Sequence, residues 1–175
     1  MKAAPWSTTV KAASAFSAIV LIGLAVGLPY ALSDASHPPF ADGMRGVLRL
    51  LPIVILAVAA LFVVRGYELD GRDLVVQRLL WATRVPLEGL ESAWQDPDAM
   101  AGSLRVFGNG GLFAITGVFR NGKLGMYRAF VTDRERSVVL RTRAKKAIVV
   151  SPERPEAFLT AVKARYPGLA EVPRR

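Results

Sequence analysis

Two long uncharged hydrophobic runs occupy the first third of the chain, and shorter runs of alternating apolar and polar residues follow them. The first run covers residues 12–32 and the second covers residues 50–64. A helix needs about 20 apolar residues to cross the hydrocarbon core of a bilayer. We therefore predict transmembrane helices over about residues 12–32 and 47–64, which form an N-terminal transmembrane hairpin, residues 1–65.

Each run has an alternative interpretation. For the first, it is a cleaved signal peptide with Ala31-Leu32-Ser33 as the small-residue cleavage site. The run is longer than the 7–15 apolar residues typical of a signal peptide, which favours a retained helix. For the second run, the alternative is a buried helix in the core of a water-soluble domain.

Basic residues flank the two runs unequally. Lys2 and Lys11 precede the first run and Arg65, Arg72, Arg78 and Arg84 follow the second, whereas Arg45 and Arg49 are the connector's only cations. Cytoplasmic flanks of membrane helices carry an excess of Lys and Arg. We therefore expect a multi-pass protein of the cell (inner) membrane with both termini in the cytoplasm.

From Gly66 onward, short β-prone runs separated by turn signals predict an antiparallel sheet. Asp70-Gly71 and Asn121-Gly122 are hairpin-turn pairs, and Pro155 opens a segment with apolar residues at helical spacing. We expect an α+β, mainly antiparallel β domain over residues 66–168. It should form a curved sheet or barrel of about seven strands with a C-terminal helix. Residues 169–175 would be a short basic tail.

Four stretches of this domain carry a resemblance to a known family. They are Tyr67-Glu68-Leu69-Asp70-Gly71, Val85-Pro86-Leu87, Phe107-Gly108-Asn109-Gly110-Gly111-Leu112-Phe113 and residues 148–158. With the order of elements, they resemble the bacterial pleckstrin-homology-like (PH-like) domain proteins, over about residues 66–166. The resemblance implies a cytoplasmic, membrane-tethered binding or assembly module. The loop around Arg72 is short and net acidic, so phosphoinositide binding is not carried over from the lipid-binding PH domains.

Several classes of chemistry lack their residues. The chain has no cysteine, and its single histidine, His37, lies between the two hydrophobic runs. The carboxylate pairs Asp96/Asp98 and Asp133/Glu135 have no third ligand at a suitable spacing, and the glycines at 108–111 lack the Lys-Ser/Thr of a phosphate-binding loop. We predict no catalytic residue, no cofactor and no metal site, and therefore no enzyme.

The net charge of +9 draws attention to one cluster of cations. Arg141, Arg143 and Lys145 alternate, so on a continuing strand they would share one face, with Lys146 beside them. This is a possible patch for anionic lipid headgroups or an acidic protein partner. A solvated edge strand, protected from aggregation by its charge, explains the run equally well. No pattern typical of nucleic-acid binding accompanies these cations.

We therefore expect a non-enzymatic, membrane-anchored PH-like module that binds a lipid or protein partner, or a second copy of itself, at the cytoplasmic membrane surface. One alternative is an accessory subunit of a larger membrane complex. Gly23 and Gly27 have the small-xxx-small spacing that permits close helix packing. Another alternative is a membrane enzyme whose site the sequence does not reveal.

Overall fold

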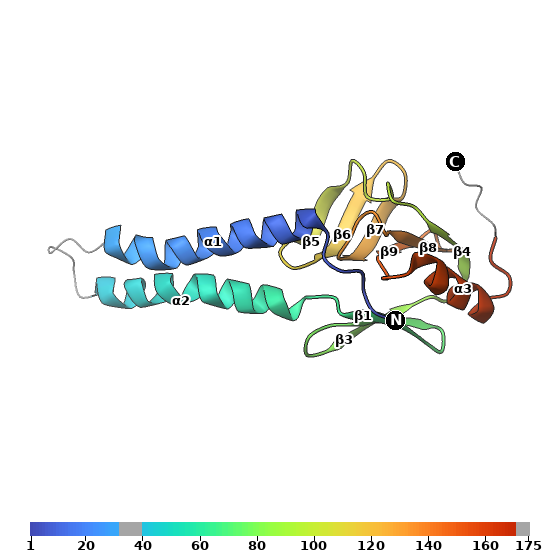
Figure 1. Ribbon diagram of the computed structural model, residues 1–175, viewed down its shortest axis with the longest axis horizontal. Helices are drawn as coiled ribbons and strands as arrows, with labels where there is room; N and C mark the ends of the chain where they lie inside the picture. The colour runs from blue at the N-terminus through green and yellow to red at the C-terminus, as the bar shows by residue number, and fades with distance from the viewer. Residues whose placement is uncertain (32–39, 171–175) are drawn as a thin grey trace.

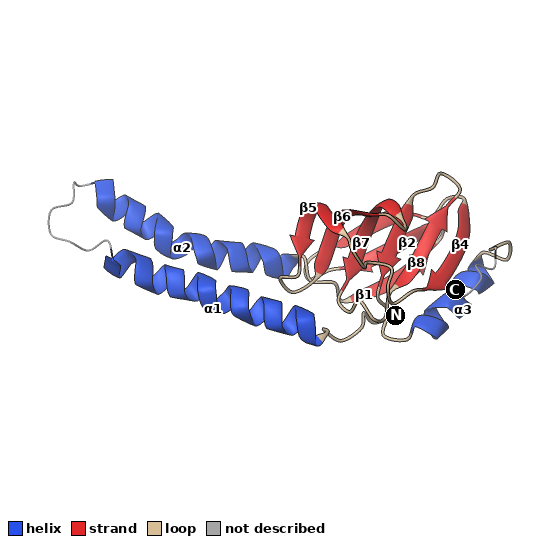
Figure 2. Ribbon diagram, turned by 90° about the horizontal axis from the view of Figure 1, so that it is seen from above, coloured by secondary structure: helices blue, strands red, loops and turns tan. Residues whose placement is uncertain are grey.

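Two long helices extend from a β domain in the computed structural model, which describes residues 1–31 and 40–170 (Figure 1). Helix α1 covers Thr8–Ala31 and α2 covers Phe40–Leu61, and the two lie side by side in both views (Figures 1 and 2). His37 and residues 33–39 of the predicted connector lie outside the described residues, as does most of the predicted tail.

Both helices begin earlier than the hydrophobic runs that predicted them. Helix α1 starts at Thr8 rather than near residue 12, and α2 starts at Phe40 rather than at residue 47. Polar residues can join a helix wherever water or neighbouring groups solvate them, so hydropathy alone does not fix a helix boundary. Pro52 consequently lies in the middle of α2, where it is buried.

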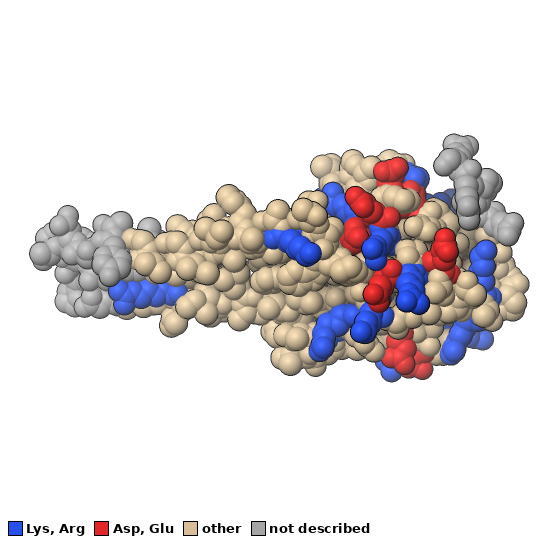
Figure 3. Space-filling view, in the orientation of Figure 1, with Lys and Arg blue, Asp and Glu red and all other residues tan. Residues whose placement is uncertain are grey.

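The paired helices present apolar side chains outward. Phe16, Ile19, Leu50 and Ile53 are all exposed, and the visible face of the pair is almost free of charge in Figure 3. Among the described residues, one segment, Thr8–Gly27 of α1, is long and apolar enough to cross a membrane, and the apolar part of α2, Gly46–Leu61, is shorter. An N-terminal helix of this kind suits a membrane anchor or a signal sequence. An exposed apolar surface of this kind is typical of a site that contacts lipid or another protein.

Nine strands build the β domain, rather than the seven or so that were expected. Strands β1 (Gly66–Asp70), β2 (Asp73–Gln77) and β3 (Ala82–Pro86) form one antiparallel sheet in that order. A second sheet has the order β4-β8-β9-β7-β6-β5, with β7 and β9 parallel and every other pair antiparallel. Its strands are β4 (Leu90–Gln95), β5 (Leu104–Gly110), β6 (Ile115–Asn121), β7 (Gly125–Val131), β8 (Val138–Thr142) and β9 (Ala147–Val150).

Each face of the six-stranded sheet packs against a hydrophobic core cluster over part of its area. On one face, the three-stranded sheet and the C-terminal helix α3 (Pro155–Arg165) enclose a core in which Phe158 and Val162 are buried, as their helical spacing predicted. On the other face, Val10 from the first turn of α1 packs into a second cluster with Phe119 and Tyr127. The start of α1 is therefore part of the β domain's core.

Residues 1–7 are also built into the β domain, although the sequence analysis grouped them with the helices. Met1 accepts a hydrogen bond from the Tyr67 N–H (2.8 Å), and Ala4 donates one to the Ser151 carbonyl (2.8 Å). Lys2 forms an isolated bridge with Gly66. The segment before α1 and the segment after α2 therefore lie next to each other.

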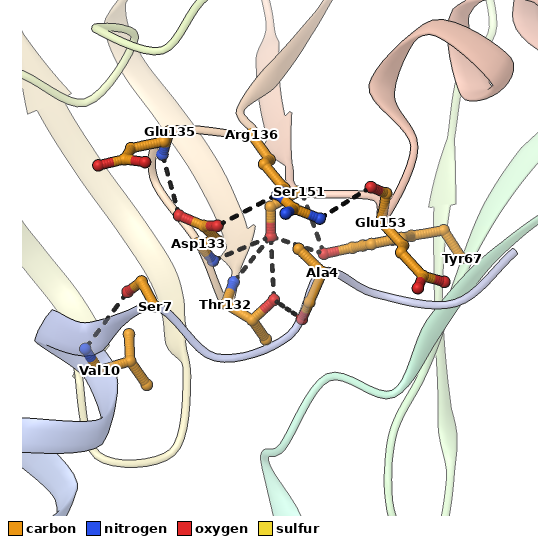
Figure 4. A network of polar contacts seen from close by, with 10 residues as sticks. All are labelled: Ala4, Ser7, Val10, Tyr67, Thr132, Asp133, Glu135, Arg136, Ser151 and Glu153. Atoms are coloured by element: carbon orange, nitrogen blue, oxygen red, sulfur yellow. Dashed lines mark hydrogen bonds and ion pairs between the residues drawn. The ribbon is translucent and has the colours of Figure 1, made fainter.

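A buried polar network holds this junction together (Figure 4). The Tyr67 hydroxyl donates to the Phe130 carbonyl (2.6 Å) and accepts from the Ser151 N–H (3.1 Å). The Thr132 hydroxyl donates to the Ala4 carbonyl (2.8 Å), and the Thr132 N–H donates to Ser151 Oγ (2.8 Å). Buried polar groups are costly without partners, so the N-terminal segment is needed to complete the network.

We expect Tyr67→Phe to lower the free energy of unfolding by about 1–3 kcal/mol, because it leaves the buried Phe130 carbonyl and Ser151 N–H without this partner. Tyr166→Phe is a matched control, because the Tyr166 hydroxyl has no hydrogen-bond partner among the described residues. It should change stability by a few tenths of a kcal/mol at most. Denaturant unfolding of the full chain in detergent measures both, and equal effects would contradict this role of the Tyr67 hydroxyl.

Stability should also fall in alkaline solution because of the same side chain. Burial raises the pKa of Tyr67 from 10.0 to about 12. The unfolded chain then loses this proton first, so the stability is fully present below pH 10 and declines as the pH rises toward 12, by about 1.4 kcal/mol per pH unit. The decline should be shallower in Tyr67→Phe, and identical slopes in the two proteins would contradict the assignment.

Candidate functional site

A pocket lies at the end of the β domain that is farthest from α1 and α2. Figures 1 and 2 place α3 and β4 at this distal end. The pocket has a volume of about 380 Å³ and is lined by the β1–β2 turn, the β8–β9 turn, the start of β4 and the segment after α3. Its lining residues are Gly71, Arg72, Leu90, Arg143, Arg165, Tyr166, Pro167 and Gly168.

Local backbone contacts bring these separate segments together. Gly71 adopts a φ of +58°, which allows the two-residue turn between β1 and β2 that carries Arg72. Arg165 Nε, at the end of α3, donates to the Gly71 carbonyl (3.1 Å) and ties the helix to that turn. The Arg143 N–H donates to the Gly89 carbonyl (2.8 Å), which holds the β8–β9 turn beside the start of β4.

The pocket is rich in hydrogen-bond donors. Within the described part of the chain, no ion pair involves the guanidinium groups of Arg72, Arg143 or Arg165. The Tyr166 hydroxyl is buried and lacks a hydrogen-bond partner there. Burial raises the pKa of Tyr166, with Arg165 acting in the opposite direction, so this hydroxyl keeps its proton at neutral pH. Several arginine side chains around one pocket suit an oxyanion such as a carboxylate.

The predicted cationic face of Arg141, Arg143 and Lys145 is not formed. Strand β8 ends at Thr142, and Lys145 has a φ of +57° in the turn that follows, so the alternation of side chains stops. Arg141 is half-buried, with its guanidinium 5.7 Å from the centre of the Trp94 ring on β4. Lys145 and Lys146 are exposed in the turn, and only Arg143 of this set lines the pocket.

The edge-strand explanation of the same run is wrong as well, because β8 pairs with β4 on one side and β9 on the other. The grouping of Arg72 and Arg165 with Arg143 was not predicted from the sequence. These residues come from three distant segments and share no local spacing. A pattern search along the chain offers no signal for such a grouping.

The other motifs have structural roles. The Asp96 and Asp133 side chains accept hydrogen bonds from the N–H groups of Asp98 and Glu135, at 3.1 Å each, as loop turn-formers do. A Cβ on Gly108 would lie 2.3 Å from the Thr116 carbonyl oxygen, so this glycine allows β5 and β6 to approach closely. No cluster of potential metal ligands occurs in residues 1–31 and 40–170.

Comparison with known proteins identifies one family. Residues 65–166, more than half of the 175-residue chain, match the sequence model described as Bacterial PH domain. Searches of curated proteins and of solved structures found no match.

Sulfate should stabilise the full chain through the pocket. A ligand at ten times its Kd that binds only the folded state adds about 1.4 kcal/mol. Sulfate also stabilises proteins by exclusion from their surface, so the informative quantity is the difference between variants. We expect the double substitution Arg143→Ala/Arg165→Ala to lose the stabilisation that comes from sulfate binding in the pocket. Lys145→Ala, in the same turn as Arg143 but outside the pocket, should keep it. Thermal unfolding against sulfate concentration measures both, and equal shifts in all proteins would contradict an anion site.

Proposed function

The chain belongs to the bacterial PH domain family, and from this premise we propose that it is a membrane-anchored, non-enzymatic binding module. In this proposal α1 and α2 hold the β domain at the cytoplasmic surface of the cell (inner) membrane. The pocket of Arg72, Arg143, Arg165 and Tyr166 binds an acidic segment of a protein partner. The observation that carries the proposal is that three arginines, none of them in an ion pair within the described residues, line one pocket together with Tyr166.

The connection between helices and β domain supports a paired anchor. Residues on either side of the helices, Lys2 and Gly66, form a bridge, so the chain leaves the domain through α1 and returns to it through α2. If α1 crosses the bilayer, α2 must cross back. Helix α2 has 22 residues and is about 33 Å long, but its apolar part, Gly46–Leu61, is about 24 Å long. In a crossing α2, Arg49 would therefore lie near the headgroups on the far side of the bilayer.

Burial near the N-terminus favours a retained helix over a cleaved signal peptide. Cleavage near residue 31 would remove the buried side chains of Ala4, Val10 and Ser14. It would also take the hydrogen-bond partner from the buried Thr132 hydroxyl, at a cost of about 1–3 kcal/mol, and from the half-buried Phe113 N–H. A domain that begins at Gly66 would be incomplete for the same reason.

Charge sets the proposed orientation. Lys2, Lys11 and Arg65 flank the helices at the end where they join the β domain, and the positive-inside rule puts that end in the cytoplasm. The pocket is at the opposite end of the domain, away from the bilayer. Charges in water interact weakly beyond a Debye length of about 8 Å, so a soluble acidic partner suits the pocket better than headgroups of the same membrane.

One observation favours the accessory-subunit alternative. Within the described chain, a Cβ added to Gly23 or Gly27 would have no heavy atom within 4 Å, so α2 does not cover this side of α1. A helix of another protein could approach closely here. A partner that co-purifies in fixed stoichiometry, and is lost in Gly23→Ile/Gly27→Ile, would favour this alternative.

The anchor predicts a definite labelling pattern. The chain has no cysteine, so Pro5→Cys and Lys145→Cys each create a single reactive thiol at an exposed position. Both should react with a membrane-impermeant maleimide in inside-out vesicles, and neither should react in intact cells. Loss of the Pro5→Cys label from the mature protein would indicate cleavage, and opposite sidedness of the two sites would contradict a paired crossing.

The pocket predicts binding that does not depend on lipid charge. In nanodiscs of uncharged lipid, the full chain should bind a soluble glutamate-rich peptide. Removing one charge-assisted guanidinium contact costs about 1.5–3 kcal/mol, so Arg143→Ala or Arg165→Ala should weaken binding roughly 10- to 100-fold. Lys145→Ala and Lys146→Ala are matched controls and should change the affinity little. Equal losses in all four variants would indicate diffuse electrostatic attraction and contradict the pocket as the site.

A further inference from the structure

The exposed large hydrophobic side chains of the β domain are concentrated in three places. Between residues 66 and 170, they are Leu79, Leu80 and Trp81 in the β2–β3 turn, Leu104, Val106 and Phe107 on β5, and Met126 at the start of β7. Their exposed fractions run from 40% for Trp81 to 78% for Phe107. A soluble surface rarely gathers so many large apolar side chains, which marks this region as an interaction surface.

The β2–β3 turn lies against the end of α2. The Trp81 ring packs edge-on against Phe62 with 5.3 Å between ring centres. Arg78, just before the turn, donates from Nη1 to the Phe62 carbonyl (2.8 Å) and lies over the Phe62 ring. Phe62 follows directly after α2, so the turn is at the level where this helix meets the domain.

Strand β5 lies at the same level beside α1. The Phe113 N–H, in the loop after β5, donates to Ser14 Oγ (2.8 Å), and the Phe113 ring contacts Trp6 at 5.7 Å between centres. Both views place β5 at the end of the six-stranded sheet next to the helices (Figures 1 and 2). The exposed apolar residues of the domain therefore adjoin the apolar surface of the helices.

Arginines are interspersed with these apolar residues on the sheet. Leu104, Arg120 and Met126 are directly paired across β5, β6 and β7, and so are Phe107, Val118 and Arg128 in a neighbouring row. Directly paired residues point to the same face of a sheet. Both arginines are exposed. Apolar side chains alternating with arginines match the boundary between lipid tails and phosphate groups.

We propose that Leu79, Leu80, Trp81, Leu104, Val106 and Phe107 form an apolar collar that sits in the interfacial layer of the bilayer crossed by α1 and α2. This inference rests on the proposed membrane anchor. The collar continues the exposed apolar surface of the helices, so a bilayer that covers Phe16 and Leu50 reaches it without a change of orientation. The collar thereby fixes the β domain upright, with the arginine pocket pointing away from the membrane.

A second copy of the chain is the competing occupant of β5. This strand is at the edge of its sheet and could pair with another strand. The β2–β3 turn argues for the bilayer, because Leu80 is apolar and 76% exposed at the same level but belongs to the other sheet. Pairing of two β5 edges would leave that turn uncovered.

The test uses the full chain with one introduced cysteine, since the native chain has none. Leu80→Cys and Phe107→Cys, both at highly exposed positions that leave the core intact, are labelled with an environment-sensitive fluorophore in nanodiscs. Ile53→Cys on α2 reports the anchor, and Lys145→Cys reports the aqueous end. We expect positions 80 and 107 to be quenched by lipid-attached nitroxide and protected from iodide as at position 53. Position 145 should behave in the opposite way.

Each other outcome has a distinct meaning. Lipid quenching at position 53 with iodide quenching at 80 and 107 would overturn the collar and leave the anchor standing. Iodide quenching at position 53 would overturn the anchor itself. Protection at position 107 that disappears with one chain per nanodisc, while position 80 stays accessible to iodide, would show that a second copy covers β5 and would also overturn the collar.

Discussion

The structure depends on one buried junction, in which the chain before α1 is hydrogen-bonded into the β sandwich next to the strand that follows α2. Tyr67, Thr132 and Ser151 need partners because they are buried, and the backbone of Ala4 supplies two of them. This requirement fixes both ends of the helical pair to one site on the domain. The two helices therefore start and end at the same place on the β domain. The β domain is incomplete without residues 1–7.

That junction gives the molecule two unlike ends. Where the helices join, exposed apolar side chains such as Leu80 and Phe107 surround them. At the far end, the turns that carry Arg72 and Arg143 meet the end of α3 at Arg165. In the proposed arrangement, the first end faces lipid and the other binds an anion in water. A PH-like sandwich placed between them can present a binding site at a fixed distance from a membrane, in agreement with a binding role for this family domain.

The cationic run at residues 141–146 illustrates how sequence spacing can mislead. The alternation of Arg141, Arg143 and Lys145 predicted one charged face of a strand. In the structure, β8 ends at Thr142, and the backbone of Lys145 adopts the left-handed conformation. Arg141 packs on Trp94, whereas Arg143 lines the pocket. Two arginines that are close in sequence therefore lie in different environments. A strand's length depends on its partner strands, and no local pattern encodes where β4 and β9 stop pairing with β8.

The sequence by itself determined the elements whose signals are local. Hydropathy located both apolar helices, Gly71 identified a turn through its backbone freedom, and the spacing of Phe158 and Val162 gave the buried face of α3. Only the tertiary structure decided the strand order, the burial of residues 1–7 in the domain and the grouping of Arg72 with Arg165. These features join residues that are far apart in the chain. Their energy comes from burial and hydrogen bonds that exist only after the segments meet, so no short stretch of sequence reveals them.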